Sequence, residues 1–185
     1  MARNTLSRTL HDTGLAAWFG GSLMGAVGLN AAAGAVDDPR QAGRVANVGW
    51  DRWTPVNAAA IGALLVGSVG QLGGNADRIA NQKGVASMSV LKTALTVAAM
   101  GATAYSRVLG RKLSAAGDVP AEGGTTPAAG TPPELASAQR QLKVMQWVIP
   151  ASTGALLAVS SYAGEQQRAS EVAEGGLRKK LALSR

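Results

Sequence analysis

The sequence predicts an all-α integral membrane protein in which four transmembrane helices form a small bundle. Charged residues are absent from 13–36, 53–76 and 144–164, and 84–106 is interrupted only by Lys92. A helix of about 20 residues crosses the hydrocarbon core of a bilayer, which is about 30 Å thick. Only 4% of the residues are aromatic, so a core in water would be built from side chains that bury little area. Small side chains suit helix packing in lipid instead.

The aromatic side chains provide a second indication, because they lie near the ends of the charge-poor segments. Trp and Tyr prefer the headgroup level of a bilayer, where the ring contacts the apolar edge and the polar atom reaches water. We therefore expect six aromatic residues to anchor the helices at the membrane interface: Trp18, Trp50, Trp53, Tyr105, Trp147 and Tyr162.

The first charge-poor segment has two interpretations. The basic N-terminus and the small residues 31–33 would suit a signal peptide and its cleavage site. However, the apolar run is long for a signal peptide, and Asp12 interrupts the approach to it. We expect the segment to be retained as the first span, preceded by an N-terminal segment of residues 1–12. Residues 13–116 then form a three-helix membrane region with its connectors.

Small residues recur at four-residue spacing in three of the segments, which places them on one face of each helix. The functional interpretation is a contact with a second copy or another protein. The alternative is packing within this chain, because such spacing is common in apolar helices. The candidate interface residues are Gly21 and Gly25, Ala94 and Ala98, and Gly154 and Ala158.

Three ionisable residues form the candidate ligand site of the sequence: His11, Asp12 and Lys92. A lysine within a span costs about 2.5–3.5 kcal/mol, so Lys92 either extends towards the headgroups or marks an ion or proton pathway. His11 and Asp12 lie just before the first span, where they could meet a quinone or a lipid headgroup or form an interfacial polar pair. Neighbours on a helix point about 100° apart, so we do not expect these two to act on each other.

The sequence offers little for catalysis or for cofactor binding. It contains no cysteine and one histidine, which excludes thiolate nucleophiles and bis-histidine haem. Zinc and copper sites need several converging ligands, and the carboxylates here are scattered through the connectors. We therefore predict a non-catalytic protein with no cofactor, no metal and no catalytic residue.

The connectors differ in composition and in expected structure. The acidic residues 37–38 stand directly before Pro39, a pattern that favours a capped helix start over a metal site. Residues 117–133 are rich in proline and glycine, so they form either an extended linker or a strap across the surface. Residues 134–164 are expected to form an amphipathic lead-in that turns Gln139 towards water and continues into the fourth span.

The tail, residues 165–185, carries a basic cluster that either binds anionic lipid headgroups or forms part of a solvated tail. Its candidate headgroup contacts are Arg178, Lys179 and Lys180. The net charge of +7 does not indicate nucleic acid, because the tail has no dense basic face and no aromatic residues for stacking. The Lys and Arg residues divide almost evenly between the two sides of a four-span topology, and the small excess favours both termini in the cytoplasm.

Three stretches resemble uncharacterised small multi-span membrane proteins of high-GC Gram-positive bacteria: LHDTGLAAWFGGSLMGAVGLN, GWDRWTPVNAAAIGA and AQRQLKVMQWVIPASTGAL. The resemblance covers most of the chain and implies a multi-pass protein of the bacterial inner membrane, without an activity or site residues. The sequence thus predicts an accessory or structural subunit of a larger membrane assembly, with a protein partner or a second copy beside it. The alternative is a small transporter, or a quinone- or lipid-handling protein, that uses Lys92, His11 and Asp12.

Overall fold

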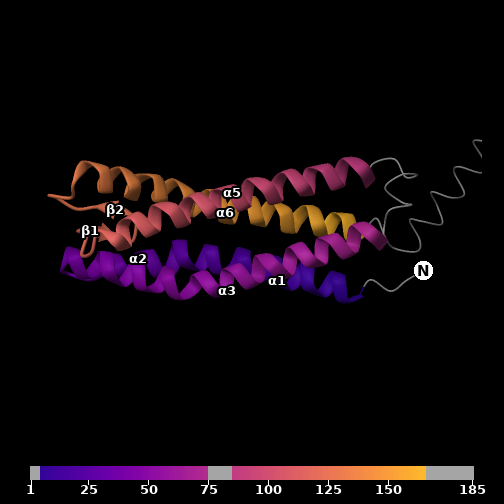
Figure 1. The fold of residues 1–185 in the computed structure, drawn as a ribbon, viewed down its shortest axis with the longest axis horizontal. Helices are drawn as coiled ribbons and strands as arrows, with labels where there is room; N and C mark the ends of the chain where they lie inside the picture. The colour runs from indigo at the N-terminus through magenta and orange to yellow at the C-terminus, as the bar shows by residue number, and fades with distance from the viewer. Residues whose placement is uncertain (1–4, 75–84, 166–185) are drawn as a thin grey trace, which may run out of the picture.

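The computed structural model describes residues 5–74 and 85–165, and it consists of long helices along one axis (Figure 1). In chain order the elements are α1 (Thr5–Met24), η1 (Gly25–Leu29), α2 (Asn30–Gly34), α3 (Pro39–Gly74), α5 (Val85–Ala115), β1 (Ala121–Gly123), β2 (Thr126–Pro127) and α6 (Pro133–Glu165). The predicted all-α class is confirmed, with one short hairpin added to it.

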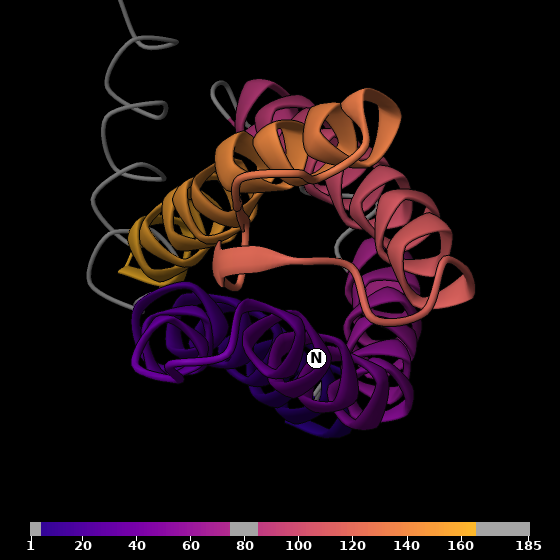
Figure 2. The same ribbon diagram turned by 90° about the vertical axis from the view of Figure 1, so that its left-hand side faces the viewer.

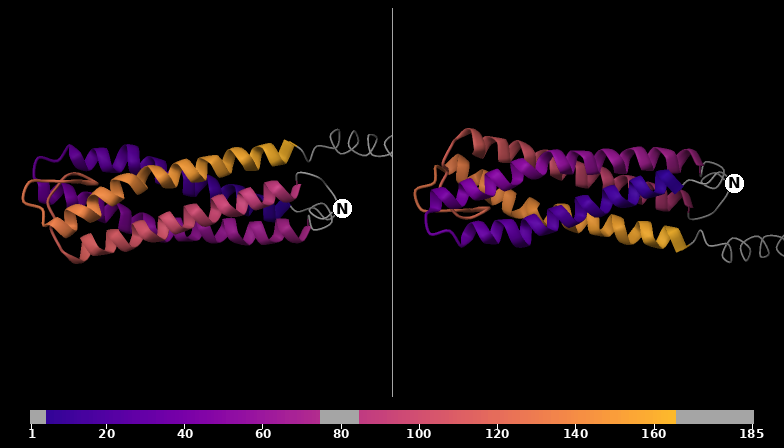
Figure 3. Two further views of the ribbon diagram at one scale, coloured as in Figure 1. Left: turned by 90° about the horizontal axis from the view of Figure 1, so that it is seen from above. Right: turned by 90° about the horizontal axis from the view of Figure 1, so that it is seen from below.

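The long helical segments alternate in direction along the bundle, as two opposite views show (Figure 3). The start of α1, the end of α3, the start of α5 and the end of α6 lie at one end, and the β-hairpin lies at the other (Figures 1 and 3). α1 packs along α3, α5 packs along α6, and α1 and α6 join the two pairs. α3 and α5 touch least among these neighbours, so the side between them is the most loosely closed.

The first long segment changes its helical geometry part of the way along. α1 passes into five residues of π-helix, η1, before α2 begins at Asn30. Wide turns of this kind occur frequently at functional sites. Asn30 directly follows the π-helix and is 7% exposed, so the change of geometry delivers a polar side chain into the bundle.

The start of α3 is the capped helix end that residues 37–38 predict. The Asp38 carboxylate accepts hydrogen bonds from the Arg40 backbone N–H at 2.9 Å and from Gln41 Nε2 at 3.2 Å. Such a carboxylate satisfies a backbone donor that has no partner within the helix. The capping interpretation is therefore confirmed.

Residues 117–133 form a strap that closes one end of the bundle, which is the second of the two arrangements that their composition allows. Within the strap, β1 and β2 pair in antiparallel fashion, and the hairpin crosses the space between the helix pairs (Figure 2). Val119 and Ala121 are 4% and 1% exposed. Contacts within the chain therefore hold this segment in place.

α6 confirms the predicted continuity of the lead-in with the fourth charge-poor segment, because one helix covers both. Gln139 differs from the prediction that it faces water. It is 2% exposed, and its Nε2 donates a hydrogen bond to the Pro120 carbonyl oxygen at 3.1 Å. The amide is buried because it fastens the strap to α6.

Two apolar clusters lie inside the bundle. The larger one consists of Leu15, Trp18, Leu64, Ala99, Ile149 and Leu156. The second lies next to the strap and consists of Leu109, Leu113, Val119 and Ala138. Trp18, a predicted interface anchor, is instead 0% exposed at the centre of the larger cluster. The interior can accept its indole because Nε1–H donates to Thr103 Oγ1 at 3.3 Å.

Three helical segments are long and apolar enough to cross a membrane: Thr5–Gly34, Pro39–Gly73 and Pro133–Tyr162. These segments fit a membrane location. α5, which contains the third predicted span, is not among them, and Lys92 interrupts the apolar character of its first half.

Candidate functional site

A cavity of about 370 Å³ lies between α3 and α5, next to the strap. One face of α3 and one face of α5 form most of its wall, and the remaining sides come from the first segment, α6 and the strap. Ligand pockets in proteins are typically about 300–1,000 Å³ in volume. The cavity is therefore large enough for a small molecule or for the head of a larger one.

The α3 wall of the cavity presents Trp50, Trp53 and Asn57. Their spacing of three and four residues puts them on one face of the helix. Two glycines of the first segment make room for the indole rings. A Cβ added to Gly21 would overlap the Trp53 ring, and one added to Gly25 would overlap the Trp50 ring. The packing of α1 and η1 on α3 therefore determines where these rings lie.

The α5 wall contributes Ser106, Arg107 and Gly110. Arg107 Nη1 donates to the Asp51 carboxylate at 2.5 Å, so an ion pair joins α5 to α3. The two side chains are 31% and 45% exposed, and such a pair contributes about 0–1 kcal/mol to stability. The pair also sets the charge of the cavity wall, because Asp51 and Arg107 are its charged residues and they neutralise each other.

Asn30 closes the end of the cavity below the strap with three hydrogen bonds. Its Oδ1 accepts from Trp50 Nε1 at 3.0 Å, and its Nδ2 donates to Gln146 Oε1 at 2.7 Å. Its backbone oxygen accepts from the Gly124 N–H at 3.1 Å. One residue therefore ties α3 and α6, through its side chain, and the hairpin, through its backbone, to the first segment.

Four polar atoms in the cavity wall are buried without a hydrogen-bond partner in the described part of the chain: Trp53 Nε1, Asn57 Oδ1, Ser106 Oγ and Arg107 Nε. A buried polar group left unpaired costs about 1–3 kcal/mol, and native structures contain few of them. These atoms are covered by neighbouring protein atoms, so the four residues line the cavity with other parts of their side chains.

The cavity becomes apolar away from the strap and reaches the surface between α3 and α5. Ile61 and Met100 lie one to two helical turns beyond the polar atoms and also line it. Four lining residues are exposed and mark the mouth of the cavity: Asp51, Ala58, Ala104 and Ser114. The site therefore combines a polar part with an apolar part, and its mouth is lined by polar and apolar residues alike.

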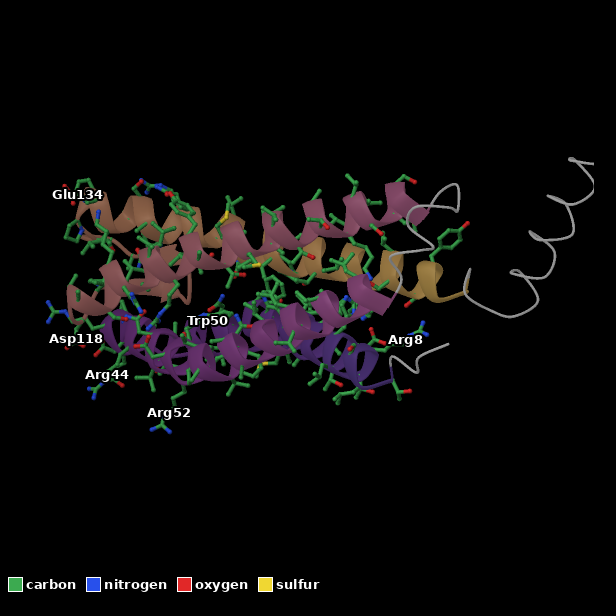
Figure 4. The ribbon with its side chains drawn as sticks, turned by 45° about the vertical axis from the view of Figure 1, so that its right-hand side comes forward. Arg8, Arg44, Trp50, Arg52, Asp118 and Glu134 are labelled. Atoms are coloured by element: carbon green, nitrogen blue, oxygen red, sulfur yellow. The ribbon has the colours of Figure 1, made fainter. Side chains whose placement is uncertain are left out.

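Arginines elsewhere on α3 have a different orientation from the wall residues. Arg44 and Arg52 project away from the bundle, whereas Trp50 lies within it (Figure 4). The face of α3 that lines the cavity is thus distinct from the face that carries these two arginines.

The three residues of the sequence-predicted ligand site lie towards the same end of the bundle, away from this cavity. Lys92 of α5 lies within electrostatic range of His11 and Asp12 of α1. The expectation that His11 and Asp12 are badly placed for each other is corrected, since His11 Nδ1 and Asp12 Oδ1 are 2.7 Å apart. Their rotamers bridge the angle between neighbours: His11 is buried at 3% exposure, and Asp12 reaches back from the surface. None of the three lines the cavity.

Metal coordination receives no support within the described residues, where no group of three His, Asp or Glu side chains lies close enough to hold an ion. The basic cluster of Arg178, Lys179 and Lys180 lies outside the described residues.

The predicted interface anchors divide into two groups in the structure. Trp50 and Trp53, like the buried Trp18, have roles inside the bundle, because they form the cavity wall. The other three are exposed on the outside of the bundle, as an interfacial residue would be: Tyr105 at 45%, Trp147 at 52% and Tyr162 at 60%.

The small residues also divide between inner and outer faces. Gly21 and Gly25 pack against tryptophans of the same chain, and a Cβ on Gly154 would lie 3.0 Å from the Phe19 ring. These three therefore serve packing within the chain, the alternative that their spacing left open. Three others lie on exposed positions of their helices: Ala94, Ala98 and Ala158.

The sequence analysis did not single out several residues of this site, among them Asn30, Asp51, Asn57, Ser106 and Arg107. The usable signal was their spacing: Trp53 with Asn57 on α3, and Ser106 with Gly110 on α5, each four residues apart at the end of a charge-poor segment.

A comparison of the chain with protein-family models, with curated proteins and with solved structures found no match.

Proposed function

We propose that this chain is a non-catalytic membrane protein that spans the bilayer four times and binds one amphipathic small molecule, such as a lipid, in the cavity between α3 and α5. The observation that carries the proposal is a cavity of about 370 Å³ whose lining combines polar side chains, such as Asn57 and Ser106, with apolar ones, such as Ile61 and Met100. The proposal keeps the lipid-handling alternative of the sequence but moves the site away from His11, Asp12 and Lys92.

The outer surface of α5 supports its assignment as a span, the third in chain order and the one needed to make four. Val90, Val97 and Val108 are 69%, 64% and 63% exposed on this helix. Contiguous apolar surface of this kind is unfavourable in water and is satisfied by lipid chains. α5 also packs along α6, which is apolar enough to cross a membrane by itself. If the segments that contain α1, α3 and α6 cross the bilayer, α5 lies in the hydrocarbon layer as well.

The location follows from the same proposal. We place the chain in a bacterial cell membrane with both termini in the cytoplasm, as the resemblance and the distribution of Lys and Arg suggest. The basic tail then faces the anionic lipids of the inner leaflet.

A second candidate function is that of an accessory or structural subunit in a larger membrane assembly. The observation that favours it is the pair Ala94 and Ala98, which lies exposed on α5 at the spacing that allows another helix to approach closely. Binding a lipid in the cavity and contacting a partner through this face are compatible, because the two sites use different sides of α5.

The binding proposal predicts that Gly110→Phe abolishes retention of a lipid-sized molecule, whereas Gly101→Phe preserves it. A Cβ on either glycine meets nothing within 4 Å, so the backbone at both positions has room for the first carbon of a side chain. Gly110 lines the cavity, and a phenyl ring there occupies the space of the guest. Native mass spectrometry of the full chain in a mild detergent measures the retained mass. Equal retention by the two variants, or none by the unsubstituted protein, contradicts the proposal.

A further inference from the structure

We infer that the outer surface of the bundle near the strap binds the headgroups of anionic phospholipids. Four cations form the binding surface, here called the basic collar: Arg52 of α3, Arg111 of α5, and Arg140 and Lys143 of α6. The inference rests on the membrane location in the proposed function but not on a ligand in the cavity. Three features carry it: the collar charges are free, they lie at one level of the bundle, and apolar side chains begin directly beyond them.

The collar side chains have no partner on the protein. All four residues are exposed, and none makes an ion pair or a hydrogen bond through its side chain within residues 5–74 and 85–165. The acidic residues of the neighbouring helix turns are paired with other cations. Asp51 pairs with Arg107, and Glu134 Oε2 lies 3.3 Å from Lys112 Nζ. The collar is therefore available to an anion from outside, and a cation strengthens its hydrogen bonds to a phosphate oxygen.

Two contacts between helices put the collar at one level of the bundle. The ion pair of Asp51 with Arg107 aligns α3 with α5, and the hydrogen bond from the Tyr105 hydroxyl to Gln141 Oε1 aligns α5 with α6. Each collar residue lies within four residues of one of these partners on its own helix. At a rise of about 1.5 Å per residue, the four positions fall within about 12 Å of one another along the bundle axis. The collar thus extends around three helices.

The remaining acidic residues lie beyond the collar, at the strap end of the bundle. Asp37 and Asp38 precede α3, and Asp118 and Glu122 belong to the strap. Figure 4 shows Asp118 at this end and Arg52 further along the bundle. Negative charge is therefore gathered at the strap end and positive charge in the collar. An anionic headgroup is attracted to the collar, whereas a zwitterionic headgroup brings a cation that the collar repels.

Apolar and aromatic side chains replace the cations one helical turn further from the strap. Val56 follows Arg52 on α3, Trp147 follows Lys143 on α6, and both are exposed. Each pair is four residues apart, so its members share one face of their helix. Headgroup phosphates at the level of the cations then leave the Trp147 ring at the edge of the hydrocarbon, the position that tryptophan prefers. The collar therefore matches the boundary between headgroups and acyl chains.

The test uses Trp147 as a reporter, because bromine atoms on an adjacent acyl chain quench its fluorescence. The full chain is reconstituted in vesicles of phosphatidylcholine and phosphatidylglycerol, with bromine on the chains of one lipid or the other. The Trp147→Phe variant identifies the part of the signal that comes from Trp147. We expect a preference for phosphatidylglycerol of about fivefold or more, since one basic residue near an anionic surface contributes about this factor. Arg140→Gln combined with Lys143→Gln should abolish the preference.

The matched control, Arg40→Gln combined with Arg44→Gln, removes the same charge from exposed positions at the start of α3 and should keep the preference. Equal losses in the two double variants would show that only net charge attracts the lipid, which overturns the inference. Equal quenching by both lipids in the unsubstituted protein overturns it as well.

Quenching by neither lipid also overturns the inference, and flotation of the vesicles then decides whether the membrane location fails with it. A chain that floats with the vesicles is in the membrane but covers this face with a second copy or another protein. A chain that does not float contradicts the membrane location, and the proposed function fails together with the inference.

Discussion

Replacing Gly14 by alanine should lower the free energy of unfolding by about 3 kcal/mol, a value at the upper end of the usual cost of overpacking. A Cβ at this position would lie 2.7 Å from the Leu64 backbone nitrogen and closer still to the Ala60 carbonyl oxygen. Both atoms belong to the backbone of α3, so the clash cannot be relieved by rotating a side chain. α1 and α3 would have to move apart, and with them the rings that form the cavity wall.

Gly20 supplies the matched control on the same helix. A Cβ at Gly20 meets nothing within 4 Å, and alanine is favoured over glycine in a helix by about 0.5–1 kcal/mol. Gly20→Ala should therefore be neutral or slightly stabilising, so that the same chemical change has opposite signs at two sites of α1. Thermal unfolding in detergent, followed by circular dichroism, measures both. Equal midpoints for the two variants would show that α1 and α3 do not pack as described.

Asn30→Ala should destabilise the protein by about 1–2 kcal/mol, because it removes the partner of two half-buried groups at once. Trp50 Nε1 loses its acceptor, and Gln146 Oε1 loses its donor. The strap should loosen as well, since the Gly124 backbone packs directly against the Asn30 side chain. We therefore expect faster hydrogen exchange at the Gly124 N–H together with the lower unfolding midpoint.

The control for this variant is Asn47→Ala, which removes the same side chain from the same cavity. Asn47 lines the cavity but makes no hydrogen bond with its side chain in the part of the chain that the structure describes. Its replacement should change the free energy of unfolding by less than about 0.5 kcal/mol. If Asn47→Ala costs as much as Asn30→Ala, the network around Asn30 does not close the cavity in the way the structure indicates.

The sequence predicted the elements whose causes are local. The cap before Pro39, the continuous helix of residues 134–164 and the order of the long helices all depend on nearby residues or on uninterrupted apolar composition. The strap was one of two arrangements open to 117–133. Choosing between them required knowing that Gln139 reaches Pro120, which is a contact between an otherwise ordinary helix face and a distant loop.

The cavity could not be predicted because the inner faces of these helices carry little distinguishing pattern. In a protein surrounded by lipid the outside is as apolar as the inside, so hydrophobic periodicity no longer marks the buried face. Trp50 and Trp53 fit the interfacial pattern of aromatic residues equally well. Their place in the wall follows from the fit of their rings against Gly21 and Gly25, which appears only once the first segment is packed on α3.

The ligand site predicted from sequence likewise has one feature that the sequence indicates and one that depends on packing. That His11, Asp12 and Lys92 share one end of the bundle follows from the alternating direction of the helices, which the sequence indicates. That His11 and Asp12 contact each other depends on side-chain rotamers and on the burial of His11 between α1 and its neighbours. Helical spacing alone argues against that contact.

The measurement that bears most directly on the four-span bundle is the sidedness of single cysteines, which the cysteine-free chain makes straightforward. Cysteines replace Thr5, Ala129 and Ser184 one at a time, and intact cells are treated with a membrane-impermeant maleimide. Four spans place Thr5 and Ser184 on one side of the membrane and Ala129 in the strap on the other. If Thr5 and Ala129 share a side while Ser184 is opposite, α5 does not cross the bilayer, and the cavity between α3 and α5 does not open into lipid.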